Sequence, residues 1–83
     1  MDLKQLRAEI DKIDDEMFRL LSERMDISAK VAEYKRENGV PVHDPLRERE
    51  ILDKLSHKVS DDHKDAITAL YKQLFELSRA IQK

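Results

Sequence analysis

The chain has 83 residues, of which 41% are charged, and its formal net charge is −2 at pH 7. A length of this order makes one small domain, spanning 1–83, and a composition with one Gly, two Pro and no Trp favours an all-α fold. The interleaved charges give no basic surface for nucleic acid, and the absence of Cys excludes disulfides and thiolate chemistry.

The first predicted helix spans about 3–38. Apolar residues recur there at alternating intervals of three and four, which is the period of a helix that buries one face. They are Leu3, Leu6, Ile10, Ile13, Met17, Leu20, Ile27, Val31 and Tyr34. Gly39 is expected to end the helix, because glycine readily adopts the left-handed conformation that follows many helix C-termini.

Two shorter helices are predicted after an extended connector. The second spans about 45–58, with Asp44 as its N-cap and Pro45 at its first position, where these residue types are favoured. The third spans about 62–82 and carries a long apolar row. Its members are Ile67, Leu70, Tyr71, Leu74 and Phe75, and the row continues through Ser78, Ile81 and Gln82.

The unequal lengths of these helices predict a partner. The first helix is far longer than the second, so its N-terminal half has no segment of its own chain to pack on. An apolar row of that length left in water would form a larger patch than soluble monomers tolerate. A second copy related by a two-fold axis is the simplest cover. We therefore expect three helices that form an intertwined homodimeric bundle.

One charged residue interrupts the apolar row of the first helix. The pattern predicts an apolar residue between Leu20 and Ile27, and the sequence has Arg24 there. Burying a guanidinium without a partner is costly. Arg24 therefore either pairs with a carboxylate of the protein, for which Glu48 is the candidate, or binds an anionic ligand. The pattern leaves both alternatives open.

Polar residues interrupt the apolar faces elsewhere too. Lys35 lies three turns after Arg24, so the two cations share a helix face at a separation of about 16 Å. Glu48 lies on the apolar face of the second helix, and Ser78 and Gln82 extend the apolar row of the third. Together they describe a pocket for a small anion that carries a hydroxyl. The alternatives are ordinary: a lysine that reaches out to solvent, a neutral helix serine and a frayed C-terminus.

Arg7 and Arg47 are two further candidates for this set. Arg7 lies about 25 Å from Arg24 along the helix and about 100° around it, so the two cannot meet within one chain. Antiparallel pairing of two first helices near Met17 or Phe18 would bring Arg7 of one copy opposite the 24–35 interval of the other. Arg47 belongs to a run of alternating charges that could equally be a solvated helix face.

No metal site, targeting segment or membrane span is predicted. The three histidines, His43, His57 and His63, lack the spacing of a helical metal pair. The N-terminus lacks the apolar core of a signal peptide, and no apolar run reaches membrane-spanning length. A cytoplasmic protein is the default expectation.

Four short elements and two further residues keep a characteristic order and spacing along the chain. The elements are Leu6-Arg7-x-x-Ile10-Asp11-x-Ile13-Asp14, Leu20-Leu21-x-Glu23-Arg24, Val31-Ala32-x-x-Lys35 and Pro41-Val42-x-Asp44-Pro45-x-Arg47-Glu48, and the residues are Ser78 and Gln82. No single element is specific, but their order and spacing together closely resemble the all-α (AroQ) class of chorismate mutases. The resemblance covers essentially the whole chain.

The resemblance implies an isomerase that converts chorismate to prephenate in phenylalanine and tyrosine synthesis without a cofactor. It also implies a homodimer in which each of two pockets is completed by an arginine of the partner subunit. Carried over by position, Arg24 and the partner's Arg7 would grip the substrate carboxylates, with Ser78 assisting. Lys35 and Gln82 would donate to the ether oxygen, where negative charge develops.

Three further positions follow from the same resemblance. Glu48, with the backbone around Asp44, would fix the ring hydroxyl, and Arg47 would orient Glu48 or add positive potential. One alternative is isochorismate pyruvate lyase, which is similar in fold, but Glu48 at the mutase position favours the mutase. Another is a non-catalytic helical dimerisation module, in which the residues at positions 24, 35 and 82 would be arbitrary.

Overall fold

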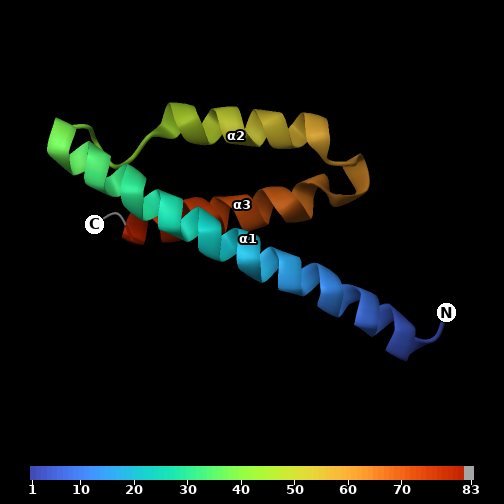
Figure 1. Ribbon diagram of the computed structural model, residues 1–83. Coiled ribbons are helices and arrows are strands. Elements are labelled where there is room, and N and C mark those ends of the chain that lie inside the picture. Colours follow the sequence, from blue (N-terminus) through green and yellow to red (C-terminus); the bar gives the residue numbers. More distant parts are fainter. Residues whose placement is uncertain (82–83) are drawn as a thin grey trace.

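The computed structural model describes residues 1–81, which form three helices (Figure 1). Helix α1 spans Leu3–Asn38, α2 spans Pro45–Lys58 and α3 spans Asp61–Ile81. The predicted all-α fold is confirmed, with one very long helix, one short helix and one of intermediate length. Helix α3 begins at Asp61, one residue earlier than expected.

Local hydrogen bonds set both ends of α1. The Asp2 side chain accepts a hydrogen bond from the Gln5 amide at 2.8 Å, and the Gln5 side chain accepts one from the Asp2 amide at 3.0 Å. This reciprocal capping box satisfies donors that a helix start leaves unpaired. At the other end Gly39 adopts the left-handed conformation, with φ 65° and ψ 28°, and its amide donates to the Lys35 carbonyl. No Gly or Pro interrupts the helix between these caps.

The connector and the start of α2 follow the same local rules. The Asp44 side chain accepts a hydrogen bond from the Arg47 amide at 3.1 Å, and Pro45 occupies the first helical turn. Proline loses nothing there, because its missing amide would have no intrahelical partner. Helix α2 ends at Lys58, and Val59 resumes an extended conformation.

Helix α3 lies at the centre of the fold. It packs against both α1 and α2, whereas α1 and α2 do not pack on each other. Figure 1 shows α2 and α3 side by side in opposite directions, with α1 crossing α3 and its N-terminal half projecting beyond. One buried apolar side chain comes from each helix, namely Ala32, Leu55 and Phe75. The core is therefore small.

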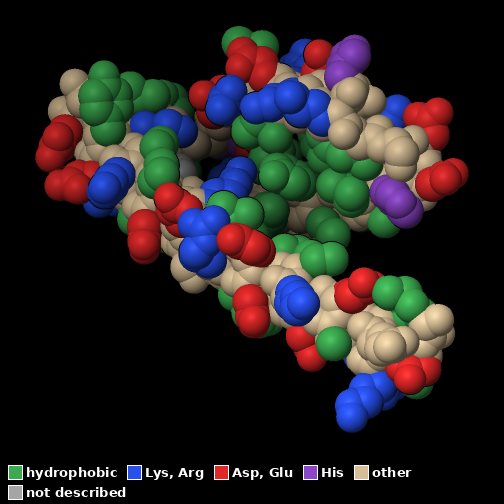
Figure 2. Space-filling view, turned by 45° about the vertical axis from the view of Figure 1, so that its right-hand side comes forward, with side chains coloured by type: hydrophobic (Ala, Val, Ile, Leu, Met, Phe, Trp, Pro, Cys, Tyr) green, Lys and Arg blue, Asp and Glu red, His purple; other side chains and the backbone are tan. Residues whose placement is uncertain are grey.

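The N-terminal half of α1 has an exposed apolar row. Leu3 and Ile13 are each 60% exposed and Ile10 is 55% exposed, although all three follow the period of a buried face. Figure 2 shows this half of α1 extending away from the rest of the chain. Within residues 1–81, no helix combines the length and the apolar character needed to cross a membrane.

Candidate active site

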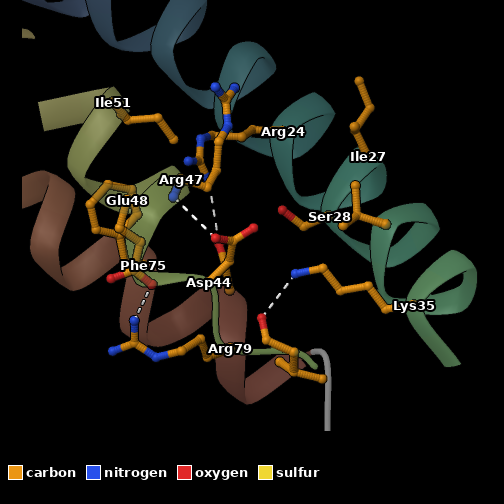
Figure 3. A pocket seen from close by; sticks show the side chains of 13 residues that line it. Arg24, Ile27, Ser28, Lys35, Asp44, Arg47, Glu48, Ile51, Phe75 and Arg79 are labelled. Atoms are coloured by element: carbon orange, nitrogen blue, oxygen red, sulfur yellow. Dashed lines mark hydrogen bonds and ion pairs between the residues drawn. The ribbon is translucent and has the colours of Figure 1, made fainter. Parts of the chain in front are cut away.

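A cavity of about 290 Å³ lies between the C-terminal half of α1, the connector, the start of α2 and the end of α3 (Figure 3). Because α1 and α2 meet only through α3, the space between them is left for side chains and a ligand. The cavity is lined by Arg24, Ile27, Ser28, Val31, Lys35, Val42, Asp44, Arg47, Glu48, Ile51, Phe75, Ser78 and Arg79. Six of the eight residues selected from the sequence are among these.

Arg24 is half-buried and is held without being neutralised. Its Nη1 donates a hydrogen bond to the Ser78 hydroxyl oxygen at 3.2 Å, and its guanidinium carbon lies 5.8 Å from the centre of the Tyr71 ring. The alternative in which Arg24 pairs with Glu48 is wrong, because Glu48 pairs elsewhere. No carboxylate among residues 1–81 forms an ion pair with Arg24. Its charge is therefore available to an anion.

Lys35 is the second half-buried cation on α1. Its Nζ donates to the carbonyl oxygen of Val42 in the connector at 2.9 Å, the contact drawn in Figure 3. A carbonyl orients the ammonium without cancelling its charge. The same bond ties the end of α1 to the segment that leads into α2. Lys35 thus points into the cavity rather than out to solvent.

Glu48 pairs with Arg79, which sequence reasoning did not select. The Arg79 Nη1 donates to Glu48 Oε2 across the α2–α3 packing. Arg47, expected to orient Glu48, instead forms an ion pair with Glu50 at 3.3 Å. The signal for Arg79 was present, since it lies four residues after the buried Phe75 and therefore on the same side of α3.

Two serines, Ser78 and Ser28, also line the cavity. Ser78 is 9% exposed, the most buried polar side chain of the described residues, and its hydroxyl accepts a hydrogen bond from Arg24, so it does not face solvent. Ser28 also lines the cavity and was not selected, although it lies one turn after Arg24 and two turns before Lys35 on the same face. Sequence reasoning missed it because a helix serine carries no charge to break an apolar pattern.

One selected residue, Arg7, does not line this cavity, and the structure does not describe another, Gln82. Arg7 lies in the exposed half of α1, in a shallow depression with Leu3, Lys4, Ala8 and Asp11. About 25 Å of helix separates it from Arg24. Gln82 lies outside the described residues, so its predicted contact with a substrate stays a prediction.

The chemistry of the cavity follows from its charges. Four cations, Arg24, Lys35, Arg47 and Arg79, face it together with two carboxylates, Asp44 and Glu48. Asp44 is already engaged in capping α2 and Glu48 in the pair with Arg79. Unpaired positive charge in a partly desolvated space attracts anions more strongly than it would in bulk water. The site is suited to a small anion with more than one carboxylate.

Comparisons with known proteins agree with this description. The profile of the family described as chorismate mutase type II matches residues 6–83. A chorismate mutase of Methanocaldococcus jannaschii is 32% identical over 83 residues, covering 98% of this chain and 84% of its own. The structure of a chorismate mutase from Thermus thermophilus, in its form II, has a TM-score of 0.90 at 32% identity. That match covers 96% of this chain and 92% of the other.

A longer relative matches over the same region. The bifunctional chorismate mutase/prephenate dehydratase of Aquifex aeolicus is 33% identical over 87 residues, which cover 99% of this chain. The present chain spans 24% of the length of that relative. The present chain therefore resembles one part of a larger polypeptide as well as a chorismate mutase of similar length.

Proposed function

The chain belongs to the type II chorismate mutase family, and on that premise we propose that it catalyses the rearrangement of chorismate to prephenate. The observation that carries the proposal is the cavity beside α3, in which Arg24 and Lys35 are held by neutral partners and keep their charge. A chorismate molecule brings two carboxylates, an ether oxygen and a ring hydroxyl. Each has a suitable group in or near this cavity.

The reaction places simple demands on the protein. One carbon–oxygen bond breaks and one carbon–carbon bond forms within a single molecule, so no nucleophile or proton transfer is needed. The protein must hold the flexible dianion in its compact conformation and stabilise the charge that develops on the ether oxygen. A preformed cavity with oriented cations meets both demands.

We assign the substrate carboxylates to Arg24 and to Arg7 of the partner subunit, with Ser78 assisting. Ser78 holds Arg24 at 3.2 Å through a hydroxyl, so the guanidinium is oriented before the substrate arrives. An arginine fork can donate two parallel hydrogen bonds to a carboxylate, which adds geometric selectivity to charge. Orientation in advance also reduces the entropy lost on binding.

We assign the ether oxygen to Lys35 and Gln82. Lys35 has a neutral carbonyl as its hydrogen-bond partner, so its full charge can act on the oxygen as the bond breaks. A donor that strengthens its bond only in the transition state raises kcat rather than binding alone. Gln82 enters through the family resemblance.

The ring hydroxyl is assigned to Glu48 and the backbone around Asp44. Glu48 lies at the opposite side of the cavity from Lys35 in Figure 3 and is oriented by Arg79. Arg47 pairs with Glu50 and does not orient Glu48, so the role that remains for it is to add positive potential at the cavity. Such a potential raises the local concentration of an anionic substrate.

We also propose that the functional form is a homodimer. The subunit exposes 6963 Å² of surface, whereas a compact monomer of its mass, 9.8 kDa, would expose about 5,200 Å². Its radius of gyration is 15.8 Å against about 12 Å for a compact chain of this length. The difference in surface, about 1,800 Å², is in the range that each partner buries in an obligate dimer.

An apolar groove supplies the surface for the second copy. It has a volume of about 460 Å³ between α1 and α3, and its lining is almost wholly apolar. The lining residues are Met17, Leu20, Leu21, Arg24, Ile67, Leu70, Tyr71, Gln73, Leu74 and Leu77. The exposed N-terminal row of α1 is of the same chemical character. Antiparallel exchange of the N-terminal halves of α1 would cover both rows and bring Arg7 to the partner's cavity.

The activity is tested by incubating the purified chain with chorismate. We expect loss of chorismate absorbance and formation of prephenate, identified by nuclear magnetic resonance. Isochorismate is the matched control, since a lyase would release pyruvate from it. Absence of turnover with both compounds would contradict the proposed function and favour a non-catalytic module. A role in phenylalanine and tyrosine synthesis also predicts a cytoplasmic location, which fractionation of cells would test.

A further inference from the structure

The Glu48–Arg79 pair differs from the other ion pairs of the described chain. Among residues 1–81 it alone joins two helices, whereas the others connect residues three or four apart on one helix. Its side chains are 25% and 31% exposed, against about 60% for the two pairs that Arg19 forms with Glu16 and Glu23 on α1. Both members line the cavity, and Figure 3 shows Arg79 reaching from α3 to Glu48 on α2.

Two consecutive residues of α3 therefore orient two charged groups of the cavity. Ser78 accepts a hydrogen bond from Arg24, and Arg79 donates one to Glu48. Neighbouring helix residues differ by about 100° in direction, so the two reach different sides of the cavity. Hydrogen bonding within the described residues engages Oε2 of Glu48, which leaves Oε1 for a ligand.

We propose that Arg79 is a positioning residue that sets the specificity of this site for a ring hydroxyl over a ring amine. It fixes the Glu48 carboxylate and compensates its charge, so Glu48 accepts a hydrogen bond from a neutral group without attracting a cation. The proposal rests on the proposed function and deepens it by naming what the ring subsite selects.

The selectivity follows from charge. A hydroxyl brings no charge, and a carboxylate already paired with a guanidinium still has lone pairs to accept its hydrogen bond. An amine at the same ring position is protonated at neutral pH, as aliphatic amines with a pKa of about 10 are. It would be repelled by Arg79 and by the other cavity cations. Without Arg79, the uncompensated Glu48 would attract it. Arg79 is thus a repulsive element against the wrong ligand.

The test compares two substrates in three proteins. We would measure kcat/KM for chorismate and for 4-amino-4-deoxychorismate with the wild type, Arg79→Met and Arg79→Lys. In Arg79→Met we expect kcat/KM for chorismate to fall about tenfold and the amine-to-hydroxyl ratio to rise at least about tenfold. Arg79→Lys keeps the charge and should restore most of the wild-type ratio.

Arg47→Met is the matched control, because it removes one cation from the same cavity but its partner is Glu50. The amine-to-hydroxyl ratio of kcat/KM should change by no more than about threefold in Arg47→Met. In a Glu48→Gln background, Arg79→Met should shift the ratio only as far as this control does, since no carboxylate remains to be released. Thermal unfolding of each variant is recorded in parallel. A purely structural role would lower stability and both activities together and leave the ratio unchanged.

Two results would overturn the proposal: an equal loss for both substrates in Arg79→Met, or an equal shift of the ratio in Arg47→Met. Failure of the proposed function is distinguishable from either. If the wild type converts neither compound, calorimetry replaces kinetics. The dissociation constants of the two compounds then give an amine-to-hydroxyl affinity ratio, which is compared among the same variants. Absence of binding to both would overturn the specificity proposal together with the function.

Discussion

The two halves of α1 carry the same apolar period but meet different surroundings. The C-terminal half packs on α3, contributes the buried Ala32 and directs Arg24 and Lys35 into the cavity. The N-terminal half, with Ile10 and Ile13 more than half exposed, projects beyond the other helices. A periodic apolar row predicts that a face is buried, but it does not name the partner. In the C-terminal half the chain itself covers part of the helix, burying Ala32 while Ile27 and Tyr34 stay more than half exposed, and for the N-terminal half we infer a second copy.

The largest effect is expected in the half of α1 that lines the cavity. Lys35→Ala should reduce kcat by about a thousandfold, because removing a donor aimed at developing charge typically costs 10²–10³. Lys30→Ala is the matched control, since Lys30 lies on the same helix, is exposed and does not line the cavity. Steady-state kinetics measures both, with circular dichroism to verify folding. More than a tenth of wild-type kcat in Lys35→Ala would remove Lys35 from its proposed role.

The exposed half should matter for catalysis only through the partner. Arg7→Ala and Arg24→Ala should each be nearly inactive as homodimers. A heterodimer of the two variants has one pocket with neither arginine and one pocket with both. We therefore expect co-refolding of the two variants to restore about half of the wild-type activity per heterodimer, as measured on tagged and purified heterodimer. If purified heterodimer stayed inactive, Arg7 would not serve the other subunit.

Stability gives a third comparison between the halves. Ile10→Ala should cost less than about 0.5 kcal/mol if Ile10 stays exposed, and about 2–4 kcal/mol per chain if a partner buries it. Phe75→Ala removes a side chain buried within its own subunit and should cost about 3–5 kcal/mol in either case. Urea unfolding at two protein concentrations tests this, because the midpoint of a dimer rises with concentration. A small, concentration-independent loss at Ile10 would contradict the assembly.

The smallest effect is expected at the start of α3, at an ion pair between the exposed Asp61 and the half-buried Lys64 that lies outside the cavity. The Lys64 ammonium donates a hydrogen bond to Asp61 at 2.8 Å, and this bond and its charge lower the pKa of the Asp61 carboxyl. Lys64→Gln should raise that pKa toward its ordinary value, as carbon-detected nuclear magnetic resonance would measure. Lys72→Gln, further along α3, should leave it unchanged.

The sign of the accompanying stability change follows from the lowered pKa. A carboxyl whose pKa is lower in the folded state stabilises the fold at pH above its unfolded value of about 3.9, and this contribution is lost as pH falls through the folded value. The wild type should therefore exceed Lys64→Gln slightly in stability at neutral pH and equal it in strong acid. An equal difference at both pH values would show that the lysine acts by packing instead.

The sequence by itself determined the helices, because their signals are local. The capping by Asp44, the left-handed Gly39 and the three-and-four spacing of apolar residues each act within a few residues of the chain. The same spacing identified Arg24 and Lys35 as cations on one inward face. Order and spacing of short elements sufficed to indicate the family, which the comparisons confirm.

The tertiary structure alone decided which charged groups meet. Glu48 could have paired with Arg24 or Arg47, and it pairs with Arg79, because the packing of α2 on α3 brings these two side chains together while α1 lies across the cavity. Arg24 accordingly has a serine as its hydrogen-bond partner and keeps its charge. Such choices depend on distances between residues far apart in sequence, and a long charged side chain can reach several candidates. No local pattern records which of them the packing brings within hydrogen-bonding distance.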